Sequence, residues 1–208
     1  MSTDRSPIKT ARLLLWALVA LAVAAFVYLL LKPAPEPHHQ GQAHSSEAGM
    51  TLGGPFTLTD GAGKPFSSAA LAGKPYAIFF GFTHCPDVCP TTLARLVKLR
   101  RQAGAGDDAL NILFVSVDPE RDTPVEVGRY TGLFNAPVVG LTGSPAQIEQ
   151  VKKQFGIYSE KVGSGLDYSV NHTTTTLLFD RSGKFVATIS PEENDVAAMA
   201  KLKRLIEA

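Results

Sequence analysis

The sequence contains two cysteines, Cys85 and Cys89, which lie four positions apart in the segment GFTHCPDVCP (residues 81–90). A continuously apolar run over residues 76–82 leads into this segment and predicts a strand that is buried on both faces. An amphipathic pattern over residues 91–101 follows it and predicts a helix. The two thiols are therefore expected at a strand-to-helix junction.

Two prolines indicate where that helix begins. Neither Pro86 nor Pro90 has a backbone N–H to donate inside a helix, so we expect the helix to begin between Asp87 and Pro90. Cys89 then lies in the first turn. Unpaired N–H groups and the helix macrodipole favour a thiolate over a thiol at this position.

Three kinds of chemistry fit a thiol pair at a helix N-terminus. A structural disulfide would stabilise the fold little, because it would close a very short loop. The other two are redox exchange and metal binding, since thiolates select soft ions such as Cu(I) and Zn(II). Structural zinc sites usually need four protein ligands, and the chain has no further cysteine to complete one, whereas Cu(I) accepts three.

A third ligand has to come from elsewhere in the chain. Residues 50–208 contain two histidines, His84 and His172. His84 is adjacent to Cys85, and backbone geometry makes it awkward for both side chains to reach one ion. His172, in the segment VNHT (residues 170–173), is the better candidate, with a solvated or core histidine as the alternative.

The apolar runs predict an α/β fold that positions these side chains. The expected strands are a hairpin at 56–59 and 64–66, buried strands at 76–82, 111–117 and 138–141, and a second hairpin at 175–179 and 184–189. Helices are expected at 91–101, 124–133, 145–155 and from 191 or 195 to 206. This order predicts a mixed central sheet with helices on both faces, whose functional end is the carboxyl edge of the strands. The cysteine segment follows such a strand end.

Three of the helix starts share one pattern of a cap residue, a proline and then a Glu or Gln. The pattern occurs at residues 123–126, 144–147 and 190–193. Each occurrence predicts a capping box with proline at the first helical position.

Two further segments border the predicted site. Asp118 and Asp122 follow the strand at 111–117 and are expected to cap a turn, with orientation of a ligand or of a positive partner as the alternative. Residues 159–167 contain Gly163-Ser164-Gly165 and are expected to form a mobile loop before His172.

Three segments resemble the Sco/SenC family, membrane-anchored copper chaperones used in assembling cytochrome c oxidase. These are GFTHCPDVCP (81–90), SVDPERDTP (116–124) and DYSVNHTTTTLLFD (167–180), and the resemblance extends from about residue 50 to the C-terminus.

The resemblance implies a thioredoxin-like fold, copper bound by Cys85, Cys89 and His172 as Cu(I), with Cu(II) as the alternative, and delivery to the copper-bearing subunit of the oxidase. Family members typically carry an aspartate where this chain has Asn171, so a charge that could orient the imidazole is lost. No proline occurs between residues 145 and 191, where thioredoxins place a cis-proline opposite the dithiol.

Other functions compete with a metallochaperone. A thiol-disulfide oxidoreductase would use Cys85 and Cys89 to reduce the cysteines of a cuproprotein before metallation, without His172. A peroxidase lacks support, because the threonine-to-single-cysteine pattern usual at such a helix start is missing. A pure interaction module has no feature in its favour beyond the linker.

The N-terminal region predicts a membrane anchor. Residues 13–31 form a run of 19 residues with no charged, amide or hydroxyl side chain other than the phenol of Tyr28. At roughly 1.5 Å per residue, a helix of this length would cross the core of a bilayer. Three basic residues precede the run and one closely follows it, so residues 1–12 are expected in the cytoplasm and the domain in the periplasm of a bacterial inner membrane. A signal peptide is the alternative, but its apolar region is usually shorter.

Residues 32–49, rich in Pro, Gly, Ser and His, predict a flexible tether between this anchor and a domain at residues 50–208. His38, His39 and His44 in the tether are either solvated spacer or weak metal ligands.

The predicted compartment and the overall charge limit the partners. In an oxidising compartment two cysteines ordinarily form a disulfide, so keeping them reduced or metal-bound would need an upstream copper donor or a thiol reductant. Outside residues 1–32 the chain has 16 basic and 18 acidic side chains, without the clustered Lys and Arg of a nucleic-acid footprint.

Overall fold

The structure, a computed structural model, describes residues 7–31, 52–104, 106–165 and 167–207. It divides into two compact units, Met1–Gly49 and Met50–Ala208. The described part of the first unit is one helix, α1 (Pro7–Leu31), with large apolar side chains exposed along it. Among the described residues, no helix combines the length and apolar character needed to cross a membrane. The predicted anchor at 13–31 is therefore not confirmed.

The predicted tether, with His38, His39 and His44, lies outside the described residues.

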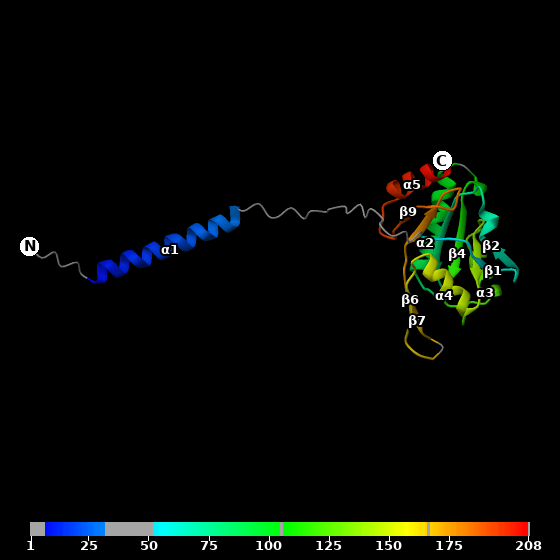
Figure 1. Cartoon of the computed structure of the whole chain (residues 1–208), viewed down its shortest axis with the longest axis horizontal. Coiled ribbons are helices and arrows are strands. Elements are labelled where there is room, and N and C mark those ends of the chain that lie inside the picture. Colours follow the sequence, from blue (N-terminus) through cyan, green and yellow to red (C-terminus); the bar gives the residue numbers. More distant parts are fainter. Residues whose placement is uncertain (1–6, 32–51, 105, 166, 208) are drawn as a thin grey trace, which may run out of the picture. The chain divides into compact units, whose positions relative to one another are not determined.

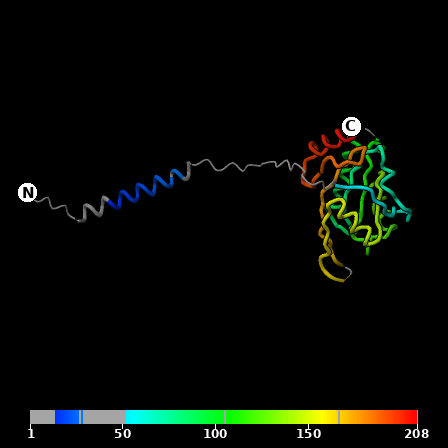
Figure 2. The backbone as a smooth tube through the Cα atoms, in the orientation of Figure 1, coloured from blue at the N-terminus to red at the C-terminus, as the bar shows by residue number. Residues whose placement is uncertain are grey.

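The second unit is built on a seven-stranded mixed sheet with strand order β2-β1-β5-β4-β3-β8-β9 (Figure 1). Its strands are β1 (Thr57–Asp60), β2 (Pro65–Ser67), β3 (Tyr76–Gly81), β4 (Asn111–Ser116), β5 (Val139–Thr142), β8 (Thr176–Phe179) and β9 (Phe185–Ile189). β3, β4 and β5 run parallel to one another, and the remaining pairs are antiparallel. A separate hairpin of β6 (Ser159–Val162) and β7 (Ser169–His172) extends from the rest of this unit (Figures 1 and 2).

Helices cover this sheet. They are α2 (Val88–Gln102), α3 (Pro124–Gly132), α4 (Pro145–Gln154) and α5 (Asp195–Glu207), with short 3-10 helices at Ser68–Leu71 and Asp107–Ala109. Phe79 and Phe80 are neighbours on β3 and so point to opposite faces, yet both are completely buried. Phe79 lies near the ring of Phe114, and Phe80 near that of Phe155 at the end of α4. Both faces of the central strand are therefore covered.

The predicted α/β fold with a mixed sheet is confirmed, and the buried strands and first three helices of the domain begin within three residues of their predicted positions. The helix carrying Cys89 begins at Val88, inside the range that the two prolines indicated.

Two local predictions were wrong. Residues 159–162 form β6, paired with β7, where a mobile loop was expected. Residues 190–193 form a turn before α5, which begins at Asp195 with Asn194 accepting from the N–H of Ala197. The start at Asp195 is one of the two that the sequence predicted, but Asn194 takes the capping role that was predicted for Ser190.

The remaining two predicted caps differ in detail. Ser144 and Gln147 form the full reciprocal capping box at α4. Thr123 caps α3 through the N–H of Glu126, but the Glu126 carboxylate pairs with Arg129 instead of closing the box.

Candidate metal centre

Cys85, Cys89 and His172 come together in one cluster. Their ligand atoms, two Sγ and one imidazole nitrogen, all lie within 4.8 Å of one another. Cys89 Sγ is 3.5 Å from His172 Nε2. Cys89 is completely buried, whereas Cys85 and His172 are partly exposed. The three side chains predicted from the sequence therefore form a cluster with an open side at Cys85.

Sheet topology brings the distant histidine to the cysteines. Cys85 lies in the loop after β3, and Cys89 is the second residue of α2. β8 runs antiparallel to β3, so the chain entering β8 lies at the edge of the sheet where β3 ends. His172 ends β7, four residues before β8 begins, and is therefore delivered to the carboxyl edge of β3.

Gly81, the last residue of β3, makes room for the buried thiol. A Cβ atom at this position would lie 2.8 Å from Cys89 Sγ and 3.0 Å from a ring carbon of Phe114. Real Cβ atoms do not approach other atoms this closely. The glycine is therefore required for the observed position of Cys89, although sequence reasoning did not single it out.

The imidazole of His172 is held in one orientation. Nδ1 lies 2.9 Å from the carbonyl oxygen of Thr173, and because a carbonyl only accepts, Nδ1 carries the proton. Nε2 then faces the cysteines and is the ring nitrogen that can bind a soft metal ion. The rings of Phe79 and Phe82 pack edge-on against the imidazole, with centroids 6.1 and 5.7 Å away.

Asn171 does not take part in this arrangement. Its side chain is exposed, and because side chains alternate along a strand, it points to the face of β7 opposite His172. The backbone carbonyl of Thr173 provides the orienting contact that the sequence suggested for an aspartate at position 171.

The two cysteines, both free in this structure, differ in protonation. The pKa of Cys85 is lowered to about 4, mainly by a hydrogen bond from the Cys89 thiol and also by hydrogen bonds from His172 and from the backbone N–H groups of Cys89 and Asp87, while burial opposes the shift. The same hydrogen bond, together with burial, raises the pKa of Cys89. The prediction that Cys89 is the favoured thiolate was therefore wrong. The N–H at the start of α2 donates to Cys85 Sγ, 3.4 Å away, and stabilises the thiolate there.

Asp122 links the cysteine loop, residues 82–87 between β3 and α2, to the end of β4. Its buried carboxylate accepts hydrogen bonds from the backbone N–H and the hydroxyl of Thr83, at 2.9 and 2.6 Å. It also accepts from the hydroxyl of Ser116 at 2.6 Å. The backbone around Asp118 and Asp122 does form the expected turn, but both carboxylates bind segments distant in sequence.

His84 lies outside the cluster, as the sequence indicated. Its side chain is 53% exposed, with Nδ1 3.1 Å from the Thr83 hydroxyl and 3.6 Å from Asp122.

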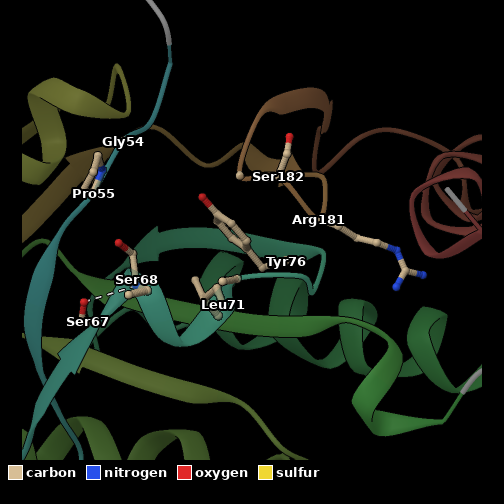
Figure 3. A pocket seen from close by; sticks show the side chains of 11 residues that line it. Gly54, Pro55, Ser67, Ser68, Leu71, Tyr76, Arg181 and Ser182 are labelled. Atoms are coloured by element: carbon tan, nitrogen blue, oxygen red, sulfur yellow. Dashed lines mark hydrogen bonds between the residues drawn. The ribbon is translucent and has the colours of Figure 1, made fainter.

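A cavity of about 600 Å³ lies elsewhere, around Tyr76 at the start of β3 (Figure 3). In Figure 3 the side chain of Arg181 points away from this cavity, and no cysteine or histidine lines it. The chemistry of the thiols is therefore confined to the opposite end of β3.

Comparison with known proteins identifies the family. The sequence model of the SCO1/SenC family matches residues 44–207. The chain is 34% identical over 197 residues to "Protein SCO2, mitochondrial" of Saccharomyces cerevisiae, an alignment that covers 92% of this chain and 65% of the yeast protein.

Two solved structures share the fold. The copper-bound ScoI of Bradyrhizobium japonicum is 44% identical, with a TM-score of 0.68 over 74% of this chain and 99% of that one. The copper-bound ScoI of Arabidopsis thaliana is 33% identical, with a TM-score of 0.70 over 75% of this chain and 98% of that one. The chain belongs to the SCO1/SenC family.

Proposed function

We propose that this chain is a copper metallochaperone that binds Cu(I) through Cys85, Cys89 and His172 and delivers it to the copper-bearing subunit of a cytochrome c oxidase. The observation that carries the proposal is the cluster itself, with two sulfur atoms and one imidazole nitrogen within 4.8 Å. Two thiolates and one imidazole match the preference of Cu(I) for soft ligands and low coordination numbers.

The geometry also suits transfer of the ion as cargo. Cys85 is partly exposed and its low pKa keeps it a thiolate at neutral pH, so it is the ligand that an incoming or receiving protein reaches first. Cys89 and His172 hold the ion from the buried side. An upstream copper donor would load the site, and a thiol reductant would keep both cysteines reduced.

We further propose that residues 13–31 anchor the chain in a bacterial inner membrane in a single pass, with residues 1–12 in the cytoplasm and the domain at 50–208 in the periplasm. The support is in the sequence, in the 19-residue run at 13–31 and the excess of basic residues before it, and it stands against the finding that no helix among the described residues meets the length and apolar character needed to cross a membrane. A fusion of a periplasm-active reporter to the C-terminus tests the topology, and activity of a cytoplasm-restricted reporter there would refute it.

A Cu(I) titration tests the copper site. The reduced domain, residues 50–208, contains every residue of the hydrophobic core and is titrated against a Cu(I) chelator of known affinity. We expect one Cu(I) per chain and weaker binding in His172→Ala. His84→Ala is the matched control, because His84 is an exposed histidine outside the cluster, and it should bind like the wild type. Equal affinity of the wild type and His172→Ala would overturn the proposed ligand set.

The asymmetry of the two thiols favours a second candidate function, a thiol-disulfide oxidoreductase. The Cys85 thiolate would attack a disulfide of a cuproprotein, and Cys89, once deprotonated, would attack Cys85 Sγ. The target would leave as a dithiol, because the Cys85–Cys89 pair supplies the two electrons that reduce the target's disulfide. An external thiol would then reduce the Cys85–Cys89 disulfide that this step forms. Disulfide exchange that is as fast in His172→Ala as in the wild type, together with weak copper binding, would favour this function.

A further inference from the structure

The strand that carries His172 is not held by the main sheet. In the described part of the chain, β6 and β7 pair with each other and with no strand of the seven-stranded sheet. Backbone hydrogen bonds to β3 or β8 therefore do not fix the distance between His172 and the cysteines. Side chains at the base of the hairpin have to do so.

Tyr168, the residue before β7, is the most firmly held of these side chains. It is 6% exposed, and its hydroxyl donates a 2.6 Å hydrogen bond to Asp118, which is itself buried. The guanidinium of Arg121 lies 3.6 Å from the centre of the Tyr168 ring, and the ammonium of Lys161 lies 4.0 Å from it. Cations over an aromatic face bind it most strongly when they are shielded from water, as Arg121 is here.

Arg121 connects Tyr168 to the metal centre. Its Nε donates to Asp118 at 2.6 Å, and Nη1 donates to the carbonyl oxygen of Tyr168 at 2.9 Å. The same guanidinium lies 5.9 Å from the centre of the Phe82 ring, which packs perpendicular to the imidazole of His172. A continuous set of contacts therefore runs from the start of β7 through Arg121 and Phe82 to the ring of His172.

We propose that Tyr168 is a positioning residue for the copper site, which fixes β7 against the end of β4 and so sets the place of His172 opposite Cys85 and Cys89. The inference rests on the proposed copper-binding function. Tyr168 acts through His172 alone and is not itself a ligand. Removing its hydroxyl should leave a site with two thiolates and a loosely held imidazole.

The test compares two single-atom deletions in the full-length chain in detergent. Tyr168→Phe removes the buried hydroxyl that binds Asp118. Tyr158→Phe removes an exposed hydroxyl near the same hairpin, which binds Glu160. We expect the Cu(I) affinity of Tyr168→Phe to fall by up to about 10-fold, the lower end of the range for losing a direct contact of a metal ligand because Tyr168 acts only indirectly, and that of Tyr158→Phe to stay at the wild-type value. X-ray absorption should show a weakened Cu–N contribution in Tyr168→Phe with both Cu–S distances unchanged.

A double-mutant cycle separates positioning from a general effect on folding. If Tyr168 acts through His172, then Tyr168→Phe should cause no further loss of affinity in a His172→Ala background. A loss of equal size in both backgrounds would overturn the inference.

A measurement on the metal-free protein separates this inference from the proposed function. The nuclear Overhauser effect between the rings of Phe82 and His172 should be present in the wild type and in Tyr158→Phe, and weakened in Tyr168→Phe. A wild type that binds no Cu(I) would overturn the proposed function, whereas an unchanged ring contact in Tyr168→Phe would overturn the positioning role.

Discussion

At the scale of single residues, the site depends on an unequal pair of thiols. Cys85 and Cys89 are chemically identical in the unfolded chain, and the fold makes one a partly exposed thiolate and the other a buried thiol. The difference arises because Cys85 Sγ receives hydrogen bonds, whereas the Cys89 thiol donates one to it and is buried away from water.

The first prediction concerns the pH dependence of Cys85 alkylation. The pKa of Cys85 is lowered to about 4, so the reactive thiolate is fully formed at neutral pH and is lost only as the pH falls through that value. An unperturbed cysteine would instead lose reactivity below about pH 8.5. Iodoacetamide labelling followed by mass spectrometry of the metal-free, reduced domain should give a rate at Cys85 that is level from pH 8 down to about pH 6.

Cys89→Ser provides the comparison, because it replaces the thiol whose hydrogen bond contributes most to the low pKa. Its alkylation profile should move toward higher pH. A wild-type rate that drops between about pH 9 and pH 8 would contradict the assignment of the thiolate to Cys85.

The second prediction concerns Gly81. In Gly81→Ala the added methyl group would meet Cys89 Sγ at 2.8 Å and a ring carbon of Phe79 at 3.1 Å, so the thiol has to move. Overpacking of this kind costs about 1–3 kcal/mol of unfolding free energy, and the displaced sulfur should weaken Cu(I) binding as well. Urea unfolding and a Cu(I) titration measure the two effects.

Gly132→Ala is the control for this substitution, because a Cβ at Gly132 in α3 meets no atom within 4 Å. It should keep wild-type copper affinity and be equally or more stable, since alanine favours a helix over glycine. Unchanged stability of Gly81→Ala would show that the end of β3 yields more easily than its close contacts indicate.

At the scale of elements, the loop between β4 and α3 contacts both segments that carry the predicted copper ligands, the loop with Cys85 and the strand β7 with His172. Asp122 binds the cysteine loop through Thr83, and Asp118 binds the start of β7 through Tyr168. The two aspartates are buried, so their hydrogen bonds are shielded from competing water.

The third prediction tests the contact to the cysteine loop. Asp122→Asn replaces a carboxylate that accepts three hydrogen bonds with an amide that has one oxygen and two N–H donors. We expect a loss of about 1.5–3 kcal/mol in unfolding free energy. Asp87→Asn, at an exposed carboxylate in the same loop, should change it by less than about 0.5 kcal/mol. Equal effects of the two substitutions in chemical denaturation would argue against the role of Asp122.

The parts of this fold that the sequence predicted are those specified by local pattern. The apolar runs gave β3 and β4, the two prolines gave the start of α2, and the Ser144–Gln147 pair gave the start of α4. Among the site residues, Cys85, Cys89 and His172 were predicted because the domain has two cysteines and two histidines, and His84 is adjacent to Cys85.

The remaining features depend on contacts between distant segments. β6 reads Ser-Glu-Lys-Val and is mostly exposed, so it shows no buried apolar pattern, and only its pairing with β7 makes it a strand. The spacing of Tyr168 and Arg121 along the chain gives no sign that they touch. Which cysteine is the thiolate depends on which sulfur atom accepts from the first N–H groups of α2. The sequence pattern does not specify that contact.

At the scale of the whole molecule, the copper site joins parts of the domain that are remote in sequence. Cys89 and His172 are 83 residues apart, and the chain between them contributes β4, β5 and the β6–β7 hairpin. The three ligands are close together only in the folded domain, so an ion bound by all three should bind the unfolded chain less well.

The fourth prediction follows from this difference in affinity. Free Cu(I) at about 100 times its dissociation constant should raise the unfolding free energy of the reduced domain by about 2.7 kcal/mol, minus whatever binding the two cysteines retain in the unfolded chain. At the same free Cu(I) concentration His172→Ala should gain less, because its folded state binds the ion more weakly, while its unfolded state keeps both thiols. Thermal or urea unfolding under a buffered Cu(I) concentration measures the gain, and a Cu(I) chelator should reverse it. An equal gain in both proteins would mean that folding does not recruit the histidine, and the ion would then be held by the two cysteines alone.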